Sequence, residues 1–475
     1  MEKNYDVVIV GSGPNGLSAG IVLAKKGLQV LIVEASNSAG GGMRTSELTL
    51  PGFKHDVCSA VHPMGYLSPF FQELDLESFG LEWVVPQASV AHPLDDEQAV
   101  ILSKSIRETA RGLGADARVY EELMSYFTPR AHDLIADSLK PLGLPKNPIQ
   151  MLRFGLKAFQ PASFFANNAF ASERAKALFA GCAAHSVLPF DKFFTSAIGL
   201  IFLITAHVEN WAFPKGGSQN LAEALLSCYQ SAGGELRLST RIERFKQLPP
   251  AKKYLFDTDP LQLSKIAEEQ LPRAYRKRLS RYTYGPGVFK IDYALSEPIP
   301  WKDPNCLKAS TIHVGGSLKE IAQSEKDAWD KKHPSKPFVL MAQQSQFDES
   351  RAPKGKHTGW AYCHVPNNST RDMTAQIENQ IERFAPGFKD IILGRHTMAT
   401  ADFYKYNPNY LGGAVTGGAA DISQLFTRPV ARLDPYSTPN PDLFIGSAST
   451  PPGGGVHGMC GFYAAKSILK GLKVP

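Results

Sequence analysis

The sequence predicts an α/β fold in which a discontinuous nucleotide-binding domain carries an inserted α+β substrate domain. Three features lead to this prediction. A β-branched run at 6–10 enters a glycine-rich turn, and a second glycine-rich loop at 447–458 precedes an apolar helical stretch near the end of the chain. Between them, the sequence is first helical and apolar and then alternates between apolar and polar residues, as half-buried strands do.

The N-terminal elements follow the order of a Rossmann-type dinucleotide site. The run at 6–10 is typical of a buried parallel strand, and the turn Gly-Ser-Gly-Pro-Asn-Gly follows at 11–16. An apolar helix is expected over 17–26, and a second strand over 29–33 ends at Glu34. A glycine motif alone is weak evidence, but here the strands, the helix and the acidic residue all stand at the expected spacing.

Each residue type in this motif has a mechanical reason. Gly11 permits the tight turn out of the strand, Gly13 lets the backbone approach a pyrophosphate, and Gly16 lets the helix pack closely on the sheet. The helix N-terminus offers free N–H groups to the phosphates, and the carboxylate of Glu34 can accept the ribose hydroxyls.

The next segment favours FAD over NAD. The glycine-rich stretch 38–45 lets the chain turn beneath a pyrophosphate, where Arg44 or Thr45 can reach phosphate or flavin. NAD dehydrogenases usually continue with βαβ repeats at this point, whereas this chain enters irregular sequence at 51–56. Near the C-terminus, a strand at 441–446 and its glycine loop would bring a second helix N-terminus onto the same ligand.

Four segments carry a family resemblance: 11–34, the doublet Gly40-Gly41 with Thr45 and 51–53, the stretch 211–217, and the ending 443–461. Together they resemble the FAD-dependent oxidoreductases of the phytoene-desaturase-like superfamily, which also includes flavin amine oxidases. The similarity is greatest to the branch named for the pyridine nucleotide-disulfide oxidoreductase domain, second type. The resemblance implies a helix at 220–232 and strands at 235–238 and 241–243 near the adenine.

The motifs and the resemblance together define the expected cofactor contacts. For FAD they are Gly11, Gly13, Pro14, Asn15, Gly16, Glu34, Ala35, Gly40, Gly41, Gly42, Arg44, Thr45, Ile242, Gly446, Ser447, Gly454, Gly455, Val456 and His457. The sequence departs from the family pattern at 245–253, where a small hairpin sheet is expected to be short or missing. Because no C-x-x-C occurs, disulfide reductase chemistry is not expected, and no set of metal ligands stands out.

The expected organisation has three parts. The FAD-binding domain comprises 1–75, 208–282 and 398–475, a helical substrate or lid region covers 76–207, and a β-rich substrate domain covers 283–397. The resemblance implies that the β-rich part covers the isoalloxazine, with the helical part beside it.

The composition limits the kinds of partner that the protein is expected to have. The net charge of +6 is small for 475 residues, and no nucleic-acid signature is present. The six cysteines are scattered, which fits a reducing compartment, and the N-terminus leaves no room for a signal peptide, so we expect a cytoplasmic protein. The apolar run 197–206 is too short for a membrane span, which needs about 20 residues. The Phe-rich stretch 151–170 fits an ordinary core, an apolar substrate channel or a face that touches a membrane.

Flavin chemistry needs few titratable groups, because the protein mainly positions the substrate and excludes water. Loss of a proton during desaturation would use one base, and His62, His457 and Tyr404 are the preferred candidates. His364 and Tyr406 are further candidates. Trp360, Tyr362 and His364 would share one face of a strand, where a core role is the simpler interpretation.

The leading functional hypothesis is an FAD-dependent oxidoreductase that desaturates a hydrophobic, polyene or isoprenoid-like substrate by hydride transfer to flavin. A flavin amine oxidase, with an aromatic pair drawn from Tyr404, Tyr406 and Tyr410, and a flavin-dependent isomerase are alternatives. A non-catalytic FAD-binding scaffold is the alternative from another class. The sequence does not indicate the oligomeric state.

Overall fold

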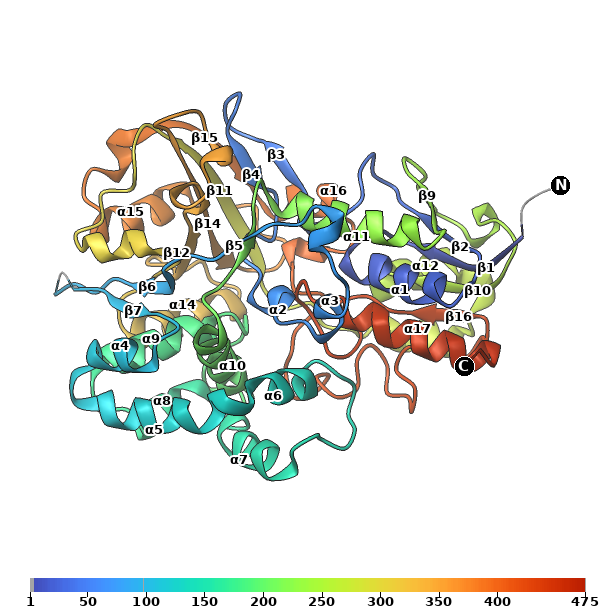
Figure 1. The fold of residues 1–475 in the computed structure, drawn as a ribbon, viewed down its shortest axis with the longest axis horizontal. Helices are drawn as coiled ribbons and strands as arrows, with labels where there is room; N and C mark the ends of the chain where they lie inside the picture. Colours follow the sequence, from blue (N-terminus) through green and yellow to red (C-terminus); the bar gives the residue numbers. More distant parts are fainter. Residues whose placement is uncertain (1–3, 97, 475) are drawn as a thin grey trace.

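A computed structural model describes residues 4–96 and 98–474, and its two larger sheets divide the chain into two lobes (Figure 1). One lobe contains both ends of the described chain and a five-stranded parallel sheet. The other contains a seven-stranded mixed sheet with helices packed beside it. Both sheets contribute residues to one large cavity, so the two lobes are described in turn.

The five-stranded sheet is built from segments that are far apart in the sequence. Its order is β16-β10-β1-β2-β9, and every pairing is parallel. The strands are β1 (Tyr5–Val10), β2 (Val30–Val33), β9 (Glu235–Arg237), β10 (Ala251–Phe256) and β16 (Leu443–Ile445). The predicted fold class, an α/β protein with a discontinuous Rossmann-type domain, is confirmed by this sheet.

Helices cover this sheet on both faces. They are α1 (Pro14–Lys25), α11 (Ser218–Ser231), α12 (Pro260–Ile266), α13 (Arg273–Leu279) and α17 (Met459–Leu472). Helix α1 packs against α11 and α17, both of which come from much later in the chain. The contact with α17 is close because Gly461 has no side chain: a Cβ atom there would overlap the carbonyl oxygen of Asn15.

The seven-stranded sheet has the order β15-β11-β14-β13-β12-β6-β7. Its strands are β6 (Ala88–His92), β7 (Val100–Leu102), β11 (Gly287–Leu295), β12 (Ala309–Val314), β13 (Val339–Ala342), β14 (His357–Val365) and β15 (Ile392–Met398). Helices α14 (Leu318–Trp329) and α15 (Thr374–Phe384) pack on it. The sheet is mixed because β6 runs parallel to β12, while the other pairings are antiparallel.

The region 76–207, expected to be helical, therefore also supplies two strands of this sheet. Its local pattern hides β6 because Ser89 and His92 are polar but buried. Ser89 accepts a hydrogen bond from the backbone N–H of Trp211, and His92 Nε2 lies 2.7 Å from the carbonyl oxygen of Gly316. Hydrogen bonds to groups that are distant in the sequence thus take the place of the bonds to water that a polar strand residue usually makes.

The rest of that region is helical as expected. It contains α4 (Ile106–Arg111), α5 (Ala117–Phe127), α6 (Ala131–Ser138), α7 (Pro148–Ala158), α8 (Ala162–Ala169), α9 (Glu173–Ala184) and α10 (Thr195–Val208). Helix α10, which holds the apolar run, is mostly buried and packs against α9 and α7. In the described part of the chain, no helix combines the length and apolarity that a membrane span requires.

Short elements complete the fold. They are β3 (Thr45–Glu47), β4 (Lys54–Asp56), α2 (Pro63–Tyr66), α3 (Pro69–Gln72), β5 (Trp83–Val84), β8 (Phe213–Pro214) and α16 (Thr400–Tyr406). Between β9 and β10 the described chain holds one 3-10 turn, Phe245–Gln247, and no hairpin, in line with the shortened segment noted in the sequence. The strand expected at 241–243 is absent there, although Ile242 is buried.

Candidate functional site

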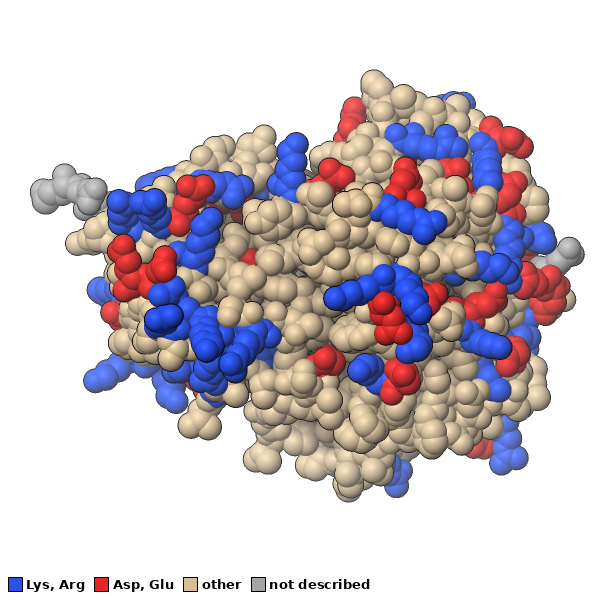
Figure 2. Space-filling model, turned by 180° about the vertical axis from the view of Figure 1, so that it is seen from behind, with Lys and Arg blue, Asp and Glu red and all other residues tan. Residues whose placement is uncertain are grey.

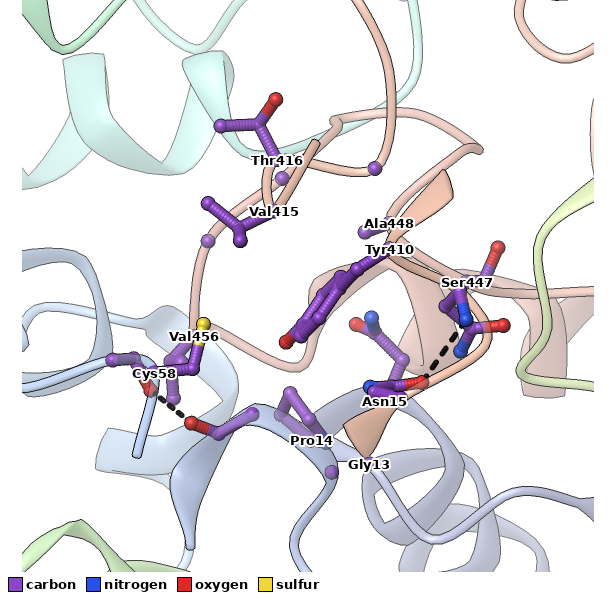
Figure 3. A pocket seen from close by; sticks show the side chains of 18 of the residues that line it. Gly13, Pro14, Asn15, Cys58, Tyr410, Val415, Thr416, Ser447, Ala448 and Val456 are labelled. Carbon is purple, nitrogen blue, oxygen red and sulfur yellow. Dashed lines mark hydrogen bonds between the residues drawn. The ribbon is translucent and has the colours of Figure 1, made fainter. Parts of the chain in front are cut away.

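A cavity of about 720 Å³ lies between the two sheets and reaches from the N-terminal glycine turn to helix α10. One end is polar and is bordered by the ends of the parallel strands. The other end is mostly apolar and is bordered by α10 and the seven-stranded sheet. Figure 3 shows the polar end, where Pro14 and Asn15 lie opposite Val415 and Thr416 and the ring of Tyr410 projects between them.

The glycine turn and Glu34 form the floor of the polar end. One carboxylate oxygen of Glu34 accepts hydrogen bonds from the backbone N–H and the hydroxyl of Ser12, at 3.0 and 2.7 Å. The other oxygen accepts from the backbone N–H of Ser36 and lies 3.3 Å from the guanidinium of Arg44. These bonds fix the carboxylate at the end of β2, where it lines the cavity.

Gly41 shows that this floor requires glycine. Its φ of +57° lies in the left-handed region, and a Cβ atom there would come within 2.9 Å of the Cα atom of Gly13. The backbone at 40–42 can therefore lie directly against the first glycine turn. The hydroxyl of Tyr406 also donates to the carbonyl oxygen of Gly41, at 2.6 Å.

Asp257 is a site residue that the sequence motifs did not identify. It follows β10, and its carboxylate accepts a hydrogen bond of 2.9 Å from the backbone N–H of Gly16, at the N-terminus of α1. Burial raises its pKa to about 8, and the nearby charge of Glu34 adds to the rise. A polar residue at the carboxyl end of a parallel strand is the signal that could have identified it.

The polar end fits a dinucleotide. The side-chain oxygens of Asn15 and Thr258 are buried, line the cavity and have no hydrogen-bond partner among the described residues. Such atoms are costly unless a ligand or water satisfies them. Residues of the C-terminal glycine loop border the same space, and Figure 3 shows Ser447 and Ala448 among the residues that line it.

Most of the expected FAD contacts line this cavity. They are Gly11, Gly13, Pro14, Asn15, Glu34, Ala35, Gly41, Gly42, Arg44, Ile242, Ser447, Gly454, Gly455, Val456 and His457. Their binding of FAD stays a prediction.

Four expected contacts support the cavity from behind and do not line it. Gly16 packs against the carbonyl oxygen of Gly11, and Gly40 lies against the side chain of Ala222. The hydroxyl of Thr45 donates to Asp56, at 2.7 Å, so it is used within the scaffold. Gly446 packs against Ala464 of α17. Their place is structural, because each makes a close contact between elements of the fold.

The apolar end is walled by residues from several elements. They include Leu139, Val187, Ile198, Ile201, Phe202, Trp211, Val288, Leu340, Ala342 and Trp360. Three residues on one face of β14, Trp360, Tyr362 and His364, all line the cavity, and adjacent rings lie 5.2 and 5.5 Å apart. This face therefore borders the cavity, where the simpler interpretation placed it in a core.

Both preferred histidines are held by hydrogen bonds to the scaffold. His62 Nε2 lies 2.7 Å from the hydroxyl of Ser218, which itself donates to the carbonyl oxygen of Ser59, so the imidazole is the donor. Nδ1 of His457 accepts from the backbone N–H of Met459. Burial lowers the pKa of each to about 4, so both line the cavity as neutral rings.

His364 is placed differently. Its Nδ1 lies 2.8 Å from the buried carboxylate of Glu325 on α14, which fixes the ring. Its Nε2 is buried and has no hydrogen-bond partner among the described residues. A neutral imidazole paired in this way carries its proton on Nδ1, which leaves the lone pair of Nε2 free in a residue that lines the cavity. The pairing with Glu325 could not be seen in the sequence.

Tyr404 does not reach the cavity, which corrects its assignment as a catalytic candidate. It is half-exposed on α16 and is not among the residues that line the cavity. Tyr406 and Tyr410 do line the cavity, with their rings 6.5 Å apart and nearly parallel. Burial raises the pKa of both phenols. Cys58 lines the same space, and the Tyr410 hydroxyl points toward it in Figure 3.

Known proteins are similar to this chain, one family over its N-terminal part and other proteins over nearly its whole length. A family described as an NAD(P)-binding Rossmann-like domain matches residues 9–74. The rat protein "Pyridine nucleotide-disulfide oxidoreductase domain-containing protein 2" is 23% identical, covering 100% of this chain and 94% of its own. A component of the limonene dehydrogenase of Castellaniella defragrans is 22% identical, at 99% and 95% coverage. A 4,4'-diapophytoene desaturase of Staphylococcus haemolyticus is 23% identical, with 95% of each chain covered.

Solved structures are similar over nearly the whole chain. An oxidoreductase from Methanosarcina mazei is 14% identical, with a TM-score of 0.64 and coverage of 98% of this chain and 100% of that one. Cyclohexylamine oxidase from Brevibacterium oxydans is 15% identical, with a TM-score of 0.60 and coverage of 99% and 100%. These likenesses show the fold. With the full-length relatives, they confirm the resemblance that the sequence motifs indicated.

Proposed function

We propose that this chain, which is similar to phytoene-type desaturases and shares a fold with flavin amine oxidases, is an FAD-dependent oxidoreductase that dehydrogenates an apolar substrate. The observation that carries the proposal is the single cavity that joins a dinucleotide cradle to an apolar chamber. FAD, when bound, would supply a two-electron acceptor. Glu34, Arg44 and Asn15 would hold it, together with the glycine loops at both ends of the chain.

The charges along the cavity favour an apolar substrate over an amine. Among the described residues that line it, the acidic ones are Glu34, Asp257 and Asp259, and all three belong to the parallel-sheet end. Each is also bonded to the scaffold there. At the apolar end no carboxylate of the described chain faces the cavity to pair with an ammonium group. A cationic substrate that entered this end would therefore lose its hydration without gaining a carboxylate partner.

His364 is the group best placed to accept a proton. Dehydrogenation of a C–C bond removes a hydride equivalent from one carbon and a proton from its neighbour. His364 Nε2 can take that proton because Glu325, 2.8 Å from Nδ1, stabilises the imidazolium that results. We assign Glu325 the role of a positioning residue, since it acts through His364. Trp360 and Tyr362, on the same face of β14, would exclude water from the reacting carbons.

The test is an anaerobic absorbance titration of the purified protein, first for bound flavin and then with limonene, carotenoid polyenes and primary amines. Bleaching of the oxidised flavin by an apolar compound, with none by amines, is the expected result. Reduction by amines alone would favour an amine oxidase. Bound FAD that no compound reduces would contradict dehydrogenation and favour an isomerase or a scaffold, and a protein that cannot be loaded with FAD would contradict the proposal as a whole.

Three variants test the roles of His364 and Glu325. His364→Gln is expected to slow flavin reduction by about a hundredfold or more, within the range for general base catalysis, while FAD content stays unchanged. Glu325→Gln should slow it less and shift the pH profile of the rate. His132→Gln, on the exposed surface of α6, is the matched control and should behave as the wild type.

A further inference from the structure

Helix α7 presents an apolar face to solvent. Ile149, Leu152 and Leu156 are exposed to 68%, 65% and 66%, and they recur at the spacing that places side chains on one side of a helix. The opposite side holds the buried Gln150 and Phe154. On a surface helix of a water-soluble domain, the side chains that face solvent are usually charged or polar. Helix α7 therefore buries Phe154 and also presents three aliphatic side chains to solvent.

The exposed apolar surface extends beyond the helix. The preceding loop contributes Leu142 and Leu144, which are exposed to 77% and 94%. Phe159, directly after α7, stacks on the exposed Phe193 with ring centroids 4.8 Å apart. We call these side chains, with those of Ile149, Leu152 and Leu156, the α7 face. Single exposed apolar residues are ordinary, but a contiguous set marks an interaction surface.

Aromatic contacts join the α7 face to the cavity. Phe159 contacts Phe194 at 5.1 Å, and Phe194 contacts Phe426 at 5.4 Å. Phe426 follows Leu425, which lines the cavity. Leu139, at the end of α6 and three residues before Leu142, lines it as well. Helix α7 also packs against α10, whose Ile198, Ile201 and Phe202 line the apolar end of the cavity. The α7 face is therefore connected to the cavity wall through α10 and through these aromatic contacts.

Within the segment 138–172, which supplies most of this face, the charged residues are of one sign. No Asp or Glu occurs between Asp137 and Glu173, whereas four basic residues do: Lys140, Lys146, Arg153 and Lys157. Lys140 and Lys146 lie near Asp137 and Asp133, at 2.5 and 3.6 Å. Among the described residues, Arg153 and Lys157 of α7 have no acidic partner. The lower margin of the molecule in Figure 2, where α7 lies in Figure 1, carries few charged side chains.

We propose that the α7 face docks on the surface of an anionic lipid bilayer. A helix with exposed aliphatic and aromatic side chains flanked by cations is the pattern that binds in the interface of such a membrane. A second copy of this chain fits less well, because a two-fold contact pairs the face with itself and would bring together two surfaces that each carry the unpaired cations Arg153 and Lys157. Docking also places the apolar end of the cavity beside the acyl chains. That last consequence rests on the proposed function, whereas the docking does not.

The experiment is co-sedimentation of the full-length protein with vesicles of phosphatidylcholine mixed with phosphatidylglycerol, and with vesicles of phosphatidylcholine alone. We expect the wild type to sediment with the mixed vesicles and to be released by salt. The triple variant I149S/L152S/L156S should lose binding by more than about a hundredfold, since three apolar side chains no longer enter the membrane. R153Q/K157Q should weaken binding to mixed vesicles by about fivefold per cation.

Two controls separate docking from folding. All three altered side chains in the triple variant are mostly solvent-exposed, so its thermal midpoint should match the wild type. The matched control V85S/L393S changes exposed apolar residues elsewhere and should keep full binding. Failure of the wild type to sediment with either vesicle overturns the proposal, as does equal binding by the triple variant. A wild-type dimer that the triple variant converts to a monomer, without vesicle binding, would assign the face to a second copy and also overturn it.

Discussion

Replacing Asp257 by Asn tests whether a buried carboxyl at the N-terminus of α1 is protonated at neutral pH. The carboxyl accepts a hydrogen bond from the Gly16 N–H, and burial beside Glu34 raises its pKa from 3.8 to about 8. Asn keeps the accepting oxygen and resembles the protonated acid in shape and charge. The variant should therefore resemble the wild type when the carboxyl is neutral and differ from it when the carboxyl is ionised.

The sign and size of the effect follow from proton linkage. Because the folded-state pKa is the higher one, the folded protein binds the proton more tightly, and stability falls as pH rises from 3.8 through 8. Above pH 8 the loss levels off. Between pH 7 and pH 9 the remaining loss corresponds to about one unit of pKa difference, or about 1 kcal/mol in the free energy of unfolding. D257N lacks this loss.

Urea unfolding of the FAD-free wild type and D257N at pH 7 and pH 9 measures the difference. Other titrating groups are common to both proteins, so the change in the stability gap isolates Asp257. We expect the gap to move by about 1 kcal/mol in favour of D257N at the higher pH. A gap that is equal at the two pH values would refute the reasoning and show that Asp257 is ionised throughout or has an ordinary pKa. FAD retention by the wild type should also weaken above pH 8, since an ionised carboxylate and a pyrophosphate repel each other.

Three further predictions concern the scaffold of the site. Gly461→Ala should destabilise the protein by about 1–3 kcal/mol in urea unfolding, because the new Cβ would overlap the carbonyl oxygen of Asn15; an unchanged midpoint would show that α17 can move freely. Arg44→Ala removes the 3.3 Å ion pair with Glu34 and should lower FAD content on gel filtration without changing the far-UV circular dichroism spectrum. The folded-state pKa of His62 lies at about 4, below the value of 6.5 for the unfolded chain, so the stability that the neutral imidazole contributes should be lost as the pH falls from 6.5 to 4. His62→Gln should therefore lose less thermal stability than the wild type over that pH range. An equal loss in the two proteins would contradict the reasoning.

The N-terminal half of the site could be predicted because its determinants are local. The strand, the turn at 11–16 and Glu34 all lie within 34 residues, and each requires a residue type that the sequence displays directly. The glycine loop at 447–458 could be predicted for the same reason. Assignments inside these motifs were less secure, since a glycine can serve a ligand or a neighbouring helix. Gly446 does the latter, since it packs against Ala464 of α17, and only packing distinguishes the two.

Features that depend on distant partners could not be predicted. His364 and Glu325 lie 39 residues apart on a strand and a helix, and nothing in either local pattern indicates that they meet. β6 pairs with β12, more than 200 residues later, and its polar residues conceal it. The Phe-rich stretch admitted several interpretations, and the structure divides it: Phe154 and Phe165 belong to the core, whereas Phe159 and Phe164 face solvent.

The parallel sheet also sets the order in which the protein can be completed during synthesis. β1 lies between β2 and β10, and β10 in turn needs β16, which is made only when residue 445 has left the ribosome. Until then, β10 has an open apolar edge, and contacts of such long sequence separation form slowly. The nascent chain thus carries its glycine turn from the outset but gains the second wall of the nucleotide site last. Flavin capture by ribosome-bound chains would therefore require synthesis beyond residue 445, and chains truncated before it should aggregate through that edge.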